Sequence, residues 1–408
     1  MKQRLLLIGL GMQGQAVLHD LVGHAEFSRI VVADNRPDLE SLAARYRGGR
    51  VVAVRVDARD ELRLTGLMRE SDVVAEALPA SLALYTGQLA ARCGVSLVSS
   101  MYYCNLEGLD SASAAVQRAS IDDLNRLAQQ RGVTILTEFG MDPGLDLLMA
   151  AKAVSEFDEV HVLHTYGAGL PAADARGNPL QYRFSWSPLG VMRSYHRPSK
   201  LIRDGRAVEI PADEIFEERN CHAIDVPELG SPLECFANGD AVRYAELLGI
   251  RHSLRESGRY TGRYPGHCAF WNTVVKSGLL GNEPLAIAGA MISPTEFMAG
   301  ALSRQRQFQY VGNERDLSFI RVEARGLRHG RPGRVVYQLI DYRDLATGFT
   351  AMQRTVGFTM SCGVQLIATG KLTKPGVLTP LAVAYEDVLP ALEPHGIRVQ
   401  VRREEGSG

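Results

Sequence analysis

Short runs of consecutive apolar residues recur along the first third of the chain, each followed by a longer stretch with helical spacing. The runs lie at residues 5–8, 30–33, 51–54, 73–75, 97–98 and 133–136. Strands that are buried on both faces of a parallel sheet read as continuous apolar runs. Because these strands alternate with helices, residues 1–140 predict a Rossmann-like, doubly wound α/β domain.

The pattern changes from about residue 141. Residues 319–325 and 335–341 alternate apolar with polar side chains, which is typical of antiparallel strands with one covered face. Residues 350–370 return to an apolar helical pattern, and residues 402–408 are charged and then Gly/Ser-rich, so we expect a frayed end. The region at residues 141–350 therefore predicts a second, α+β domain with a mixed or antiparallel sheet.

Composition narrows the classes of partner. The 408 residues include 45 Lys plus Arg and 46 Asp plus Glu, for a net charge of -1, which argues against nucleic acid or an anionic membrane as partner. Every apolar segment is interrupted before it reaches the roughly 18 residues of a membrane span. The six cysteines are scattered without a metal-binding spacing, which predicts reduced thiols, a cytoplasmic protein and no metal. A small-molecule partner is expected.

A glycine-rich sequence follows the first predicted strand directly. Gly9, Gly11 and Gly14 form the pattern G-x-G-x-x-G at the start of a predicted helix. In a dinucleotide site the first glycine permits a tight turn, the second lets the backbone approach a pyrophosphate, and the third allows close helix–sheet packing. We therefore predict cofactor binding at these glycines and at Met12, which lies between them.

An acidic residue ends the second predicted strand. Asp34 lies 20 residues after Gly14, where a carboxylate accepts hydrogen bonds from the adenosine ribose. A carboxylate there favours NAD and repels the 2′-phosphate of NADP, but Arg36 could bind that phosphate. We predict NAD with NADP as the alternative, and we add the adjacent Asn35 to the cofactor-binding candidates.

Two further segments end predicted strands at the carboxyl edge, where a doubly wound sheet binds its ligand. Asp57 follows the third strand and would face the adenine. Ala77, Leu78 and Pro79 follow the fourth and would face the nicotinamide. Ordinary strand-to-helix turns remain the alternative for both segments.

Seven short motifs occur in order along nearly the whole chain: Ala-Leu-Pro at 77–79, Ser-Ser-Met-Tyr-Tyr at 99–103, Asp-Pro-Gly at 142–144, Asn-Pro-Leu at 178–180, Phe-Ser-Trp-Ser at 184–187, Arg-Tyr-Pro-Gly-His at 263–267 and Thr-Val-Gly at 355–357. Together with the glycine fingerprint they resemble the saccharopine dehydrogenase and lysine 6-dehydrogenase family. The resemblance implies that residues 351–408 complete the cofactor domain and that residues 141–350 are an inserted substrate-binding domain that forms a homodimer.

The resemblance also implies a reaction. Members of this family oxidise a carbon–nitrogen bond of an amino acid by hydride transfer to the nicotinamide, followed by hydrolysis of the imine, or run the reverse condensation. An amine is protonated at neutral pH and must lose that proton before it can lose hydride, so an acid/base group is needed. The expected substrate is an amino acid or opine-like compound.

Candidate catalytic groups lie in the first half of the chain. Asp142 precedes a predicted helix, where its carboxylate would bind an ammonium group or act as the base; a helix N-cap followed by Pro143 is the alternative. Tyr102 and Tyr103 follow the fifth strand, and either one would hydrogen-bond substrate while the other packs in the core. Gly144 is added to the substrate-binding candidates.

Other candidates lie in the second region. Arg263 and His267 belong to a Gly- and Pro-rich segment that we interpret as a loop. Arg263 suits a carboxylate clamp, and together with Asp142 it is expected in an interdomain cleft. His267 would titrate near neutral pH and relay a proton, with a structural role as the alternative. Trp186 is a candidate wall of the substrate site, or a core residue.

The chain departs from the saccharopine-oxidising pattern at two positions. Leu189 and Gly239 stand where that pattern has arginines suited to extra carboxylates. The substrate therefore stays open between saccharopine, lysine and a related adduct, which leaves an L-lysine 6-dehydrogenase or a carboxy-polyamine dehydrogenase as alternatives. A non-catalytic dinucleotide sensor is the alternative from another class.

Overall fold

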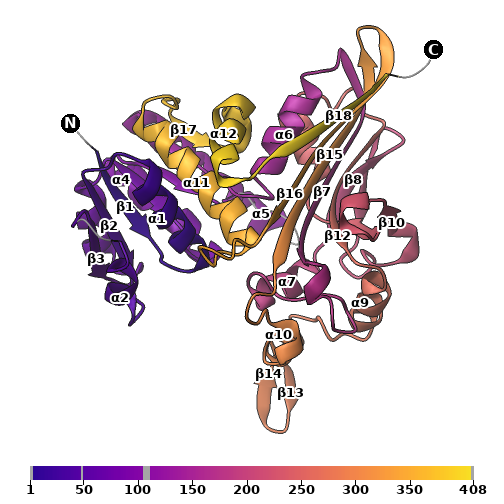
Figure 1. The fold of residues 1–408 in the computed structure, drawn as a ribbon, viewed down its shortest axis with the longest axis horizontal. Coiled ribbons are helices and arrows are strands. Elements are labelled where there is room, and N and C mark those ends of the chain that lie inside the picture. Colours follow the sequence, from indigo (N-terminus) through magenta and orange to yellow (C-terminus); the bar gives the residue numbers. More distant parts are fainter. Residues whose placement is uncertain (1–2, 47–48, 104–110, 406–408) are drawn as a thin grey trace. The chain divides into compact units, whose positions relative to one another are not determined.

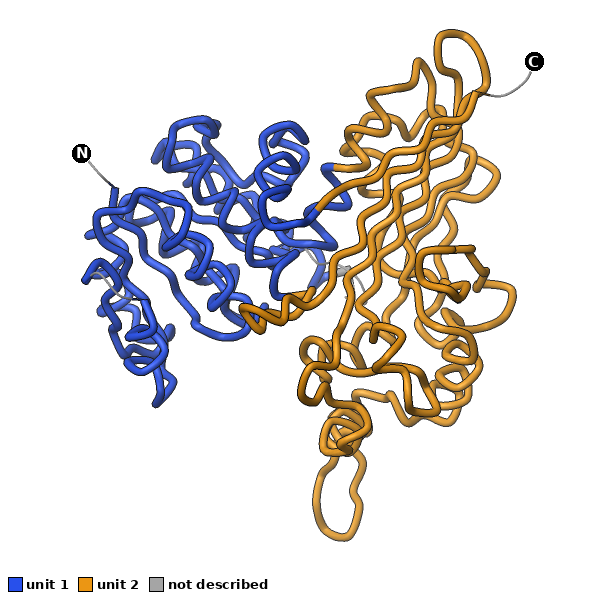
Figure 2. The backbone as a smooth tube through the Cα atoms, in the orientation of Figure 1, with its two compact units in different colours: residues 1–148, 353–397 blue, residues 149–352, 398–408 orange. Residues whose placement is uncertain are grey.

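The computed structural model describes residues 3–46, 49–103 and 111–405, and contacts divide the chain into two compact units (Figures 1 and 2). Unit 1 comprises residues 1–148 and 353–397, and unit 2 comprises residues 149–352 and 398–408. Among the described residues, no helix is both long and apolar enough to cross a membrane.

Unit 1 is built on a seven-stranded parallel sheet in the order β17-β6-β5-β4-β1-β2-β3. Its strands are β1 (Arg4–Ile8), β2 (Arg29–Asp34), β3 (Val51–Arg55), β4 (Val73–Glu76), β5 (Ser96–Ser99), β6 (Thr134–Leu136) and β17 (Gly376–Leu378). Strands β2 and β3 lie on one side of β1, and β4, β5 and β6 lie on the other, so the strand order reverses between β1 and β4. The predicted Rossmann-like sheet is confirmed, and the sequence pattern missed only the three-residue β17.

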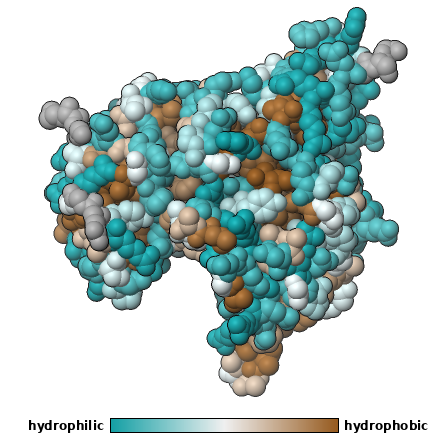
Figure 3. Space-filling model, in the orientation of Figure 1, coloured by the Kyte–Doolittle hydropathy of each residue, from teal (hydrophilic) through white to brown (hydrophobic). Residues whose placement is uncertain are grey.

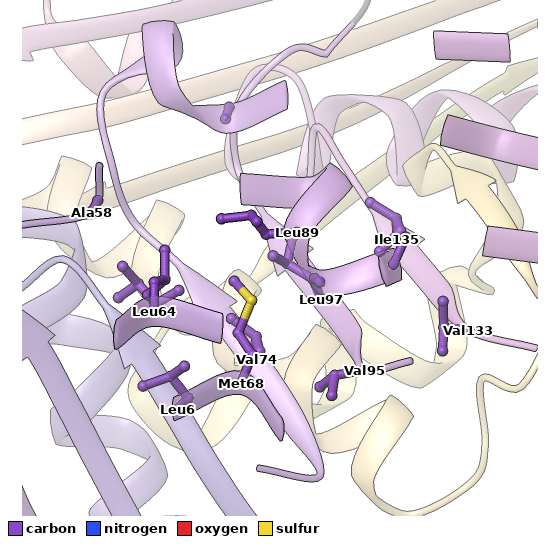
Figure 4. Packing of buried hydrophobic residues seen from close by; sticks show 14 of the residues in the cluster. Leu6, Ala58, Leu64, Met68, Val74, Leu89, Val95, Leu97, Val133 and Ile135 are labelled. Atoms are coloured by element: carbon purple, nitrogen blue, oxygen red, sulfur yellow. The ribbon is translucent and has the colours of Figure 1, made fainter. Parts of the chain in front are cut away.

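Helices cover both faces of this sheet. They are α1 (Met12–His24), α2 (Leu39–Ala43), α3 (Glu61–Arg69), α4 (Ala80–Cys93), α5 (Ser111–Arg131), α11 (Ala351–Ala368) and α12 (Tyr385–Leu392), with α6 (Leu145–Val154) starting at the end of the first segment. Figure 4 shows the core of one face, where Leu6, Val74 and Leu97 from the strands meet Leu64 and Met68 of α3. This apolar layer fixes the carboxyl ends of β1 and β4 next to each other.

Unit 2 is built on a nine-stranded mixed sheet whose main path is β10-β11-β12-β7-β15-β16-β18, with β8 and β9 attached to β12. Its strands are β7 (Glu159–Pro171), β8 (Ser199–Arg203), β9 (Arg206–Ile210), β10 (Cys221–Ile224), β11 (Leu233–Ala237), β12 (Glu256–Arg263), β15 (Asp316–Arg328), β16 (Arg331–Tyr342) and β18 (Val399–Glu405). Its helices are α7 (Pro188–Ser194), α8 (Ala241–Leu247), α9 (His267–Lys276) and α10 (Pro294–Ser303).

Two expectations for unit 2 need correction. Strands β15 and β16 pair in antiparallel register as predicted, but most of their residues are buried, so the sheet is not one-sided. Alternation arose because buried polar groups bond to one another, as Arg321 does to Gln338. The end of the chain was assigned to the cofactor domain and expected to fray, whereas residues 399–405 form a strand paired with β16.

A short hairpin of β13 (Leu285–Ile287) and β14 (Ala290–Ile292) forms a separate two-stranded sheet in unit 2. Most residues of its strands are exposed, including Leu285, Ile287 and Met291. It forms the tip at the bottom of Figure 1, and the corresponding tip of Figure 3 is coloured as apolar. The tip is thus an exposed apolar surface.

Candidate functional site

The glycine-rich turn of unit 1 has the geometry of a dinucleotide site. Gly9 has φ +92°, and a Cβ there would stand 2.6 Å from the Ala77 carbonyl oxygen. A Cβ on Gly14 would stand 1.9 Å from the Gly9 carbonyl oxygen, so this glycine lets α1 pack against the turn. A Cβ on Gly11 would meet nothing within 4 Å. Two glycines are therefore required by the fold, while Gly11 borders open space of the kind that a pyrophosphate needs.

Helix α1 begins directly after Gly11 without a side-chain cap. Uncapped N–H groups at a helix start attract anions, because the helix dipole adds to their partial positive charge. The neighbouring Met12 is 48% exposed, and its carbonyl accepts a hydrogen bond from the Gln353 side chain. The residues of this turn thus fit a phosphate-containing ligand.

Asp34, at the end of β2, is tied to the glycine-rich turn. Its Oδ2 accepts the Leu10 N–H at 2.5 Å, and its Oδ1 accepts the Arg36 N–H at 2.9 Å. The Arg36 guanidinium already bonds to Asp38 and to the Leu10 carbonyl. Asn35 is exposed beside them. The carboxylate is thus held at the position predicted for ribose binding, whereas Arg36 has partners within the protein.

The other edge residues differ in their surroundings. Asp57 is exposed, and its carboxylate accepts the N–H of Arg59, as in an ordinary turn. Ala77 and Leu78 are half-buried against Gly9, and Pro79 precedes α4. The segment after β4 therefore packs against the glycine-rich turn, while the hydrogen bond and ion pair of Asp57 are both with Arg59.

Tyr102 and Tyr103 have different environments. Tyr103 is 1% exposed within the apolar core, and its ring lies so close to Gly87 of α4 that a Cβ there would stand 2.5 Å away. Tyr102 is only half-buried. Tyr103 is therefore the one of these two tyrosines that packs in the core.

The Asp-Pro-Gly segment precedes α6 without capping it in the predicted way. The helix begins at Leu145, three residues after Asp142, so Asp142 is not the N-cap. Asp142 is exposed, and Gly144 has φ +142° with its would-be Cβ 2.0 Å from the Gly140 carbonyl oxygen. Gly144 is therefore explained by backbone packing, which the prediction of substrate binding did not foresee.

In unit 2, Arg263 and His267 meet through a tyrosine. Arg263 ends β12 and His267 begins α9, so the predicted loop is reduced to residues 264–266. Tyr195 Oη accepts the Arg263 Nε–H at 3.0 Å and lies 2.9 Å from His267 Nε2. The tautomer of His267 with its hydrogen on Nδ1 lets Tyr195 donate to Nε2. All three side chains are buried.

The electrostatics of this triad change the role of His267. Burial, followed by the positive charge of Arg263, holds the pKa of His267 well below its usual value. His267 is therefore neutral near pH 7, which corrects the expectation that it titrates there. Among the described residues no carboxylate forms an ion pair with Arg263, whose guanidinium also lies 4.9 Å from the centre of the Tyr182 ring. A buried guanidinium without an acid partner is suited to a ligand carboxylate.

Neighbouring residues complete this buried polar face. Arg259, Thr261 and Arg263 are all buried at alternate positions of β12, so their side chains share one face. Thr261 accepts a hydrogen bond from Asn238 at 2.8 Å. Trp186 is half-buried beside α7 and packs against Gly190.

Sequence reasoning missed Tyr195, Tyr182 and Arg259. The alternation along β12 is the one local signal that pointed to Arg259, because the tyrosines are far from Arg263 in sequence. Leu189 is half-buried in the apolar cluster around α7, and Gly239 has φ +93°. Neither position supplies a charge.

One group of described residues has metal-binding residue types. Asp20, His24 and His395 bring ligand atoms within 4.8 Å of one another in unit 1. Ser361 donates to Asp20 Oδ2, and the two histidine nitrogens lie 2.9 and 3.0 Å from Oδ1. These distances fit ion pairs and hydrogen bonds, so we describe the group as a polar network.

Comparison with known proteins agrees with this geometry. Residues 5–136 match the family model for the saccharopine dehydrogenase NADP binding domain, and residues 140–397 match that for the saccharopine dehydrogenase C-terminal domain. The chain belongs to the saccharopine dehydrogenase family. It is the dinucleotide-binding part of this family that carries the glycine-rich turn.

Individual relatives in the saccharopine dehydrogenase family share low sequence identity with this chain. The alpha-aminoadipic semialdehyde synthase of Arabidopsis thaliana is 26% identical over 87% of this chain and 39% of its own length, so the chain spans less than half of that relative. Saccharopine dehydrogenase (NADP(+), L-glutamate-forming) of Saccharomyces cerevisiae is 23% identical over 95% of this chain and 96% of its own. The apo structure of the Saccharomyces cerevisiae saccharopine dehydrogenase (L-Glu forming) has a TM-score of 0.82 at 21% identity, covering 98% of this chain and 100% of that one, which shows a shared fold.

Proposed function

We propose that this protein is an NAD-dependent oxidoreductase that acts on the C–N bond of an amino acid of the saccharopine or lysine type. In this reaction the carbon loses hydride, the nitrogen loses a proton, and water then adds to the imine; the reverse condensation uses the same groups. The observation that carries the proposal is the glycine-rich turn with Asp34, together with membership of the family. The nicotinamide supplies the hydride acceptor when it is bound.

The preference for NAD is supported by the surroundings of the second strand. Two backbone N–H groups donate to the Asp34 carboxylate and orient it at the end of β2, where a ribose 2′ group is expected. A 2′-phosphate would meet this negative charge, while Arg36 is occupied by Asp38. The family description names NADP, so direct comparison of the two nucleotides tests this preference.

Arg263 is proposed to bind a substrate carboxylate. Its support is the burial of a guanidinium that has no acid partner among the described residues, oriented by Tyr195. His267 is neutral there, so we propose that it orients Tyr195 and does not relay a proton. Asp142 is proposed as the group that accepts the amine proton and Tyr102 as a hydrogen-bond partner, supported by the resemblance and by their incomplete burial.

The identity of the substrate is tested by absorbance at 340 nm with saccharopine, L-lysine and carboxylated polyamines. Saccharopine is expected to be oxidised with release of L-glutamate, the product in the name of the yeast relative. Turnover of L-lysine instead would support the alternative of an L-lysine 6-dehydrogenase, which the absence of arginines at Leu189 and Gly239 leaves open. Binding of NADH without oxidation of any amine would support a non-catalytic sensor.

The same assay tests Arg263. Arg263→Lys keeps the charge but loses the planar pair of donors, so kcat/KM should fall by roughly 10²-fold. Arg255→Lys, a change at an arginine before β12, is the matched control. Unchanged turnover of Arg263→Lys would remove the carboxylate-binding role.

We also propose that the protein works as a homodimer in the cytoplasm. The dimer is supported by the exposed apolar hairpin of Leu285, Ile287 and Met291, because a two-stranded sheet is marginally stable in water on its own. The compartment is supported by the described cysteines, which are all free. Light scattering of the purified protein tests the dimer.

A further inference from the structure

A buried acid lies at the point where the strand order of unit 1 reverses. Glu76 is the last residue of β4 and is 0% exposed. It is in register with Ile8 at the end of β1 and with Ser99 at the end of β5. Its side chain therefore lies on the face that carries the core cluster of Figure 4, at the sheet edge that the glycine-rich turn occupies.

The Glu76 carboxyl group is bonded to the segment that follows it. Oε1 accepts the Leu78 N–H at 2.7 Å, which closes a short turn at Ala77–Leu78. Two atoms of this turn lie close to Gly9. A Cβ added to Gly9 would stand 2.6 Å from the Ala77 carbonyl oxygen and 3.4 Å from the Leu78 side chain. Glu76 thus contacts the glycine-rich turn through two residues.

No cation compensates the rest of the carboxyl group within the described part of the chain. Neither Oε2 nor the nearby Tyr103 hydroxyl makes a hydrogen bond of standard geometry, although the Ser99 hydroxyl lies near both groups. The polar groups that influence Glu76 are Ser99, the Leu78 N–H and Tyr103, and none of them is a cation. Burial raises the pKa of Glu76 to about 7, although Ser99 and the Leu78 N–H favour its charged form.

We propose that Glu76 is a positioning residue for the dinucleotide: its carboxyl group holds the Ala77–Leu78 turn against the glycine-rich turn, and its charge state sets how firmly that turn is held. The proposal rests on the proposed function. A carboxylate accepts an N–H more strongly than a neutral carboxylic acid does, by about a factor of two in bond strength. The ionised form therefore fixes the turn more firmly, and the protonated form relaxes it.

Affinity for NADH measured between pH 6 and pH 8.5 tests this proposal. The wild-type protein is expected to bind NADH about five- to tenfold more tightly at pH 8.5 than at pH 6, a typical size for coupling between two sites. Glu76→Gln has the shape and the acceptor of the protonated acid, so its affinity should stay near the pH 6 value throughout. Glu70→Gln removes an exposed carboxylate of the same unit and should follow the wild type.

A second variant separates charge from hydrogen bonding. Glu76→Met is similar in length but offers no oxygen to the Leu78 N–H, so it should bind NADH more weakly than Glu76→Gln at every pH. The proposal is overturned if Glu76→Gln follows the wild-type pH profile, or if Glu76→Met matches wild-type affinity at pH 8.5. Absence of binding of both NADH and NADPH by the wild type at every pH would instead refute the proposed function, and with it this inference.

Discussion

The Tyr195 hydroxyl is the single atom that joins Arg263 to His267, so its removal gives a well-defined perturbation. Tyr195→Phe keeps the ring and deletes an oxygen that lies 3.0 Å from Arg263 Nε and 2.9 Å from His267 Nε2. A hydrogen bond to a charged group contributes about 2 kcal/mol and one to a neutral group about 1 kcal/mol. Because both partners are buried, the free energy of unfolding should fall by about 3 kcal/mol.

Tyr182→Phe is the matched control. Tyr182 is 2% exposed and its ring also lies beside Arg263. Its hydroxyl lies near Arg263 and Tyr195 but makes no hydrogen bond of standard geometry among the described residues. Deleting that hydroxyl should change stability by less than about 1 kcal/mol. Urea unfolding of the two variants and the wild type gives the comparison from their midpoints at a common m value. Equal losses in the two variants would refute the assignment of the hydrogen bonds to Tyr195.

Three further predictions concern unit 1. Gly11→Ala should weaken NADH binding, measured by calorimetry, at least about tenfold while leaving the Tm unchanged. Gly14→Ala should instead lower the Tm, because its Cβ would stand 1.9 Å from a carbonyl oxygen. Equal effects of the two variants on the Tm would contradict this prediction. The pKa of Glu76 is raised in the folded state, so the wild type should lose stability relative to Glu76→Gln as the pH rises from 4.5 to 7. The difference in the free energy of unfolding between the two proteins should change by about 3 kcal/mol over this range. A difference in urea midpoint that stays constant with pH would refute this prediction. Hydrogen bonds from His395 and Ser361 outweigh burial and lower the pKa of Asp20, so Asp20→Asn should be less stable at pH 7 by roughly 1–3 kcal/mol. That difference should shrink as the pH falls below the ordinary pKa of an aspartate, because the unfolded chain then binds a proton before folded Asp20 does.

The fold of unit 1 could be predicted well because its sequence signals each lie within a short segment of the chain. Each parallel strand is buried on both faces, so it reads as an apolar run, and Gly9 to Gly14 lie within six residues. Asp34 follows at a spacing that the βαβ unit itself imposes. Glu76 gave no such signal, since an acid at the end of an apolar run is indistinguishable from an exposed turn residue until its burial is known.

The site in unit 2 could be predicted only in part. Arg263 and His267 were found, but Tyr195 is 68 residues before Arg263, and nothing in the local sequence links them. His267 was expected to titrate near neutral pH, with a structural role as the alternative. The local sequence did not reveal that it begins a buried helix beside a guanidinium, which lowers its pKa. Strand β18 was missed because a charged segment reads as a frayed end until its partner β16 is known.

The way the chain passes between the two units limits how either can be produced separately. A continuous fragment of residues 149–352 would lack β18, leaving the backbone N–H and C=O groups of β16 as an unpaired edge that favours aggregation. A fragment of residues 1–148 would lack β17 and α11, and with them one edge and part of one face of its sheet. Separate expression of a single unit therefore needs its distant segments to be rejoined by an engineered linker.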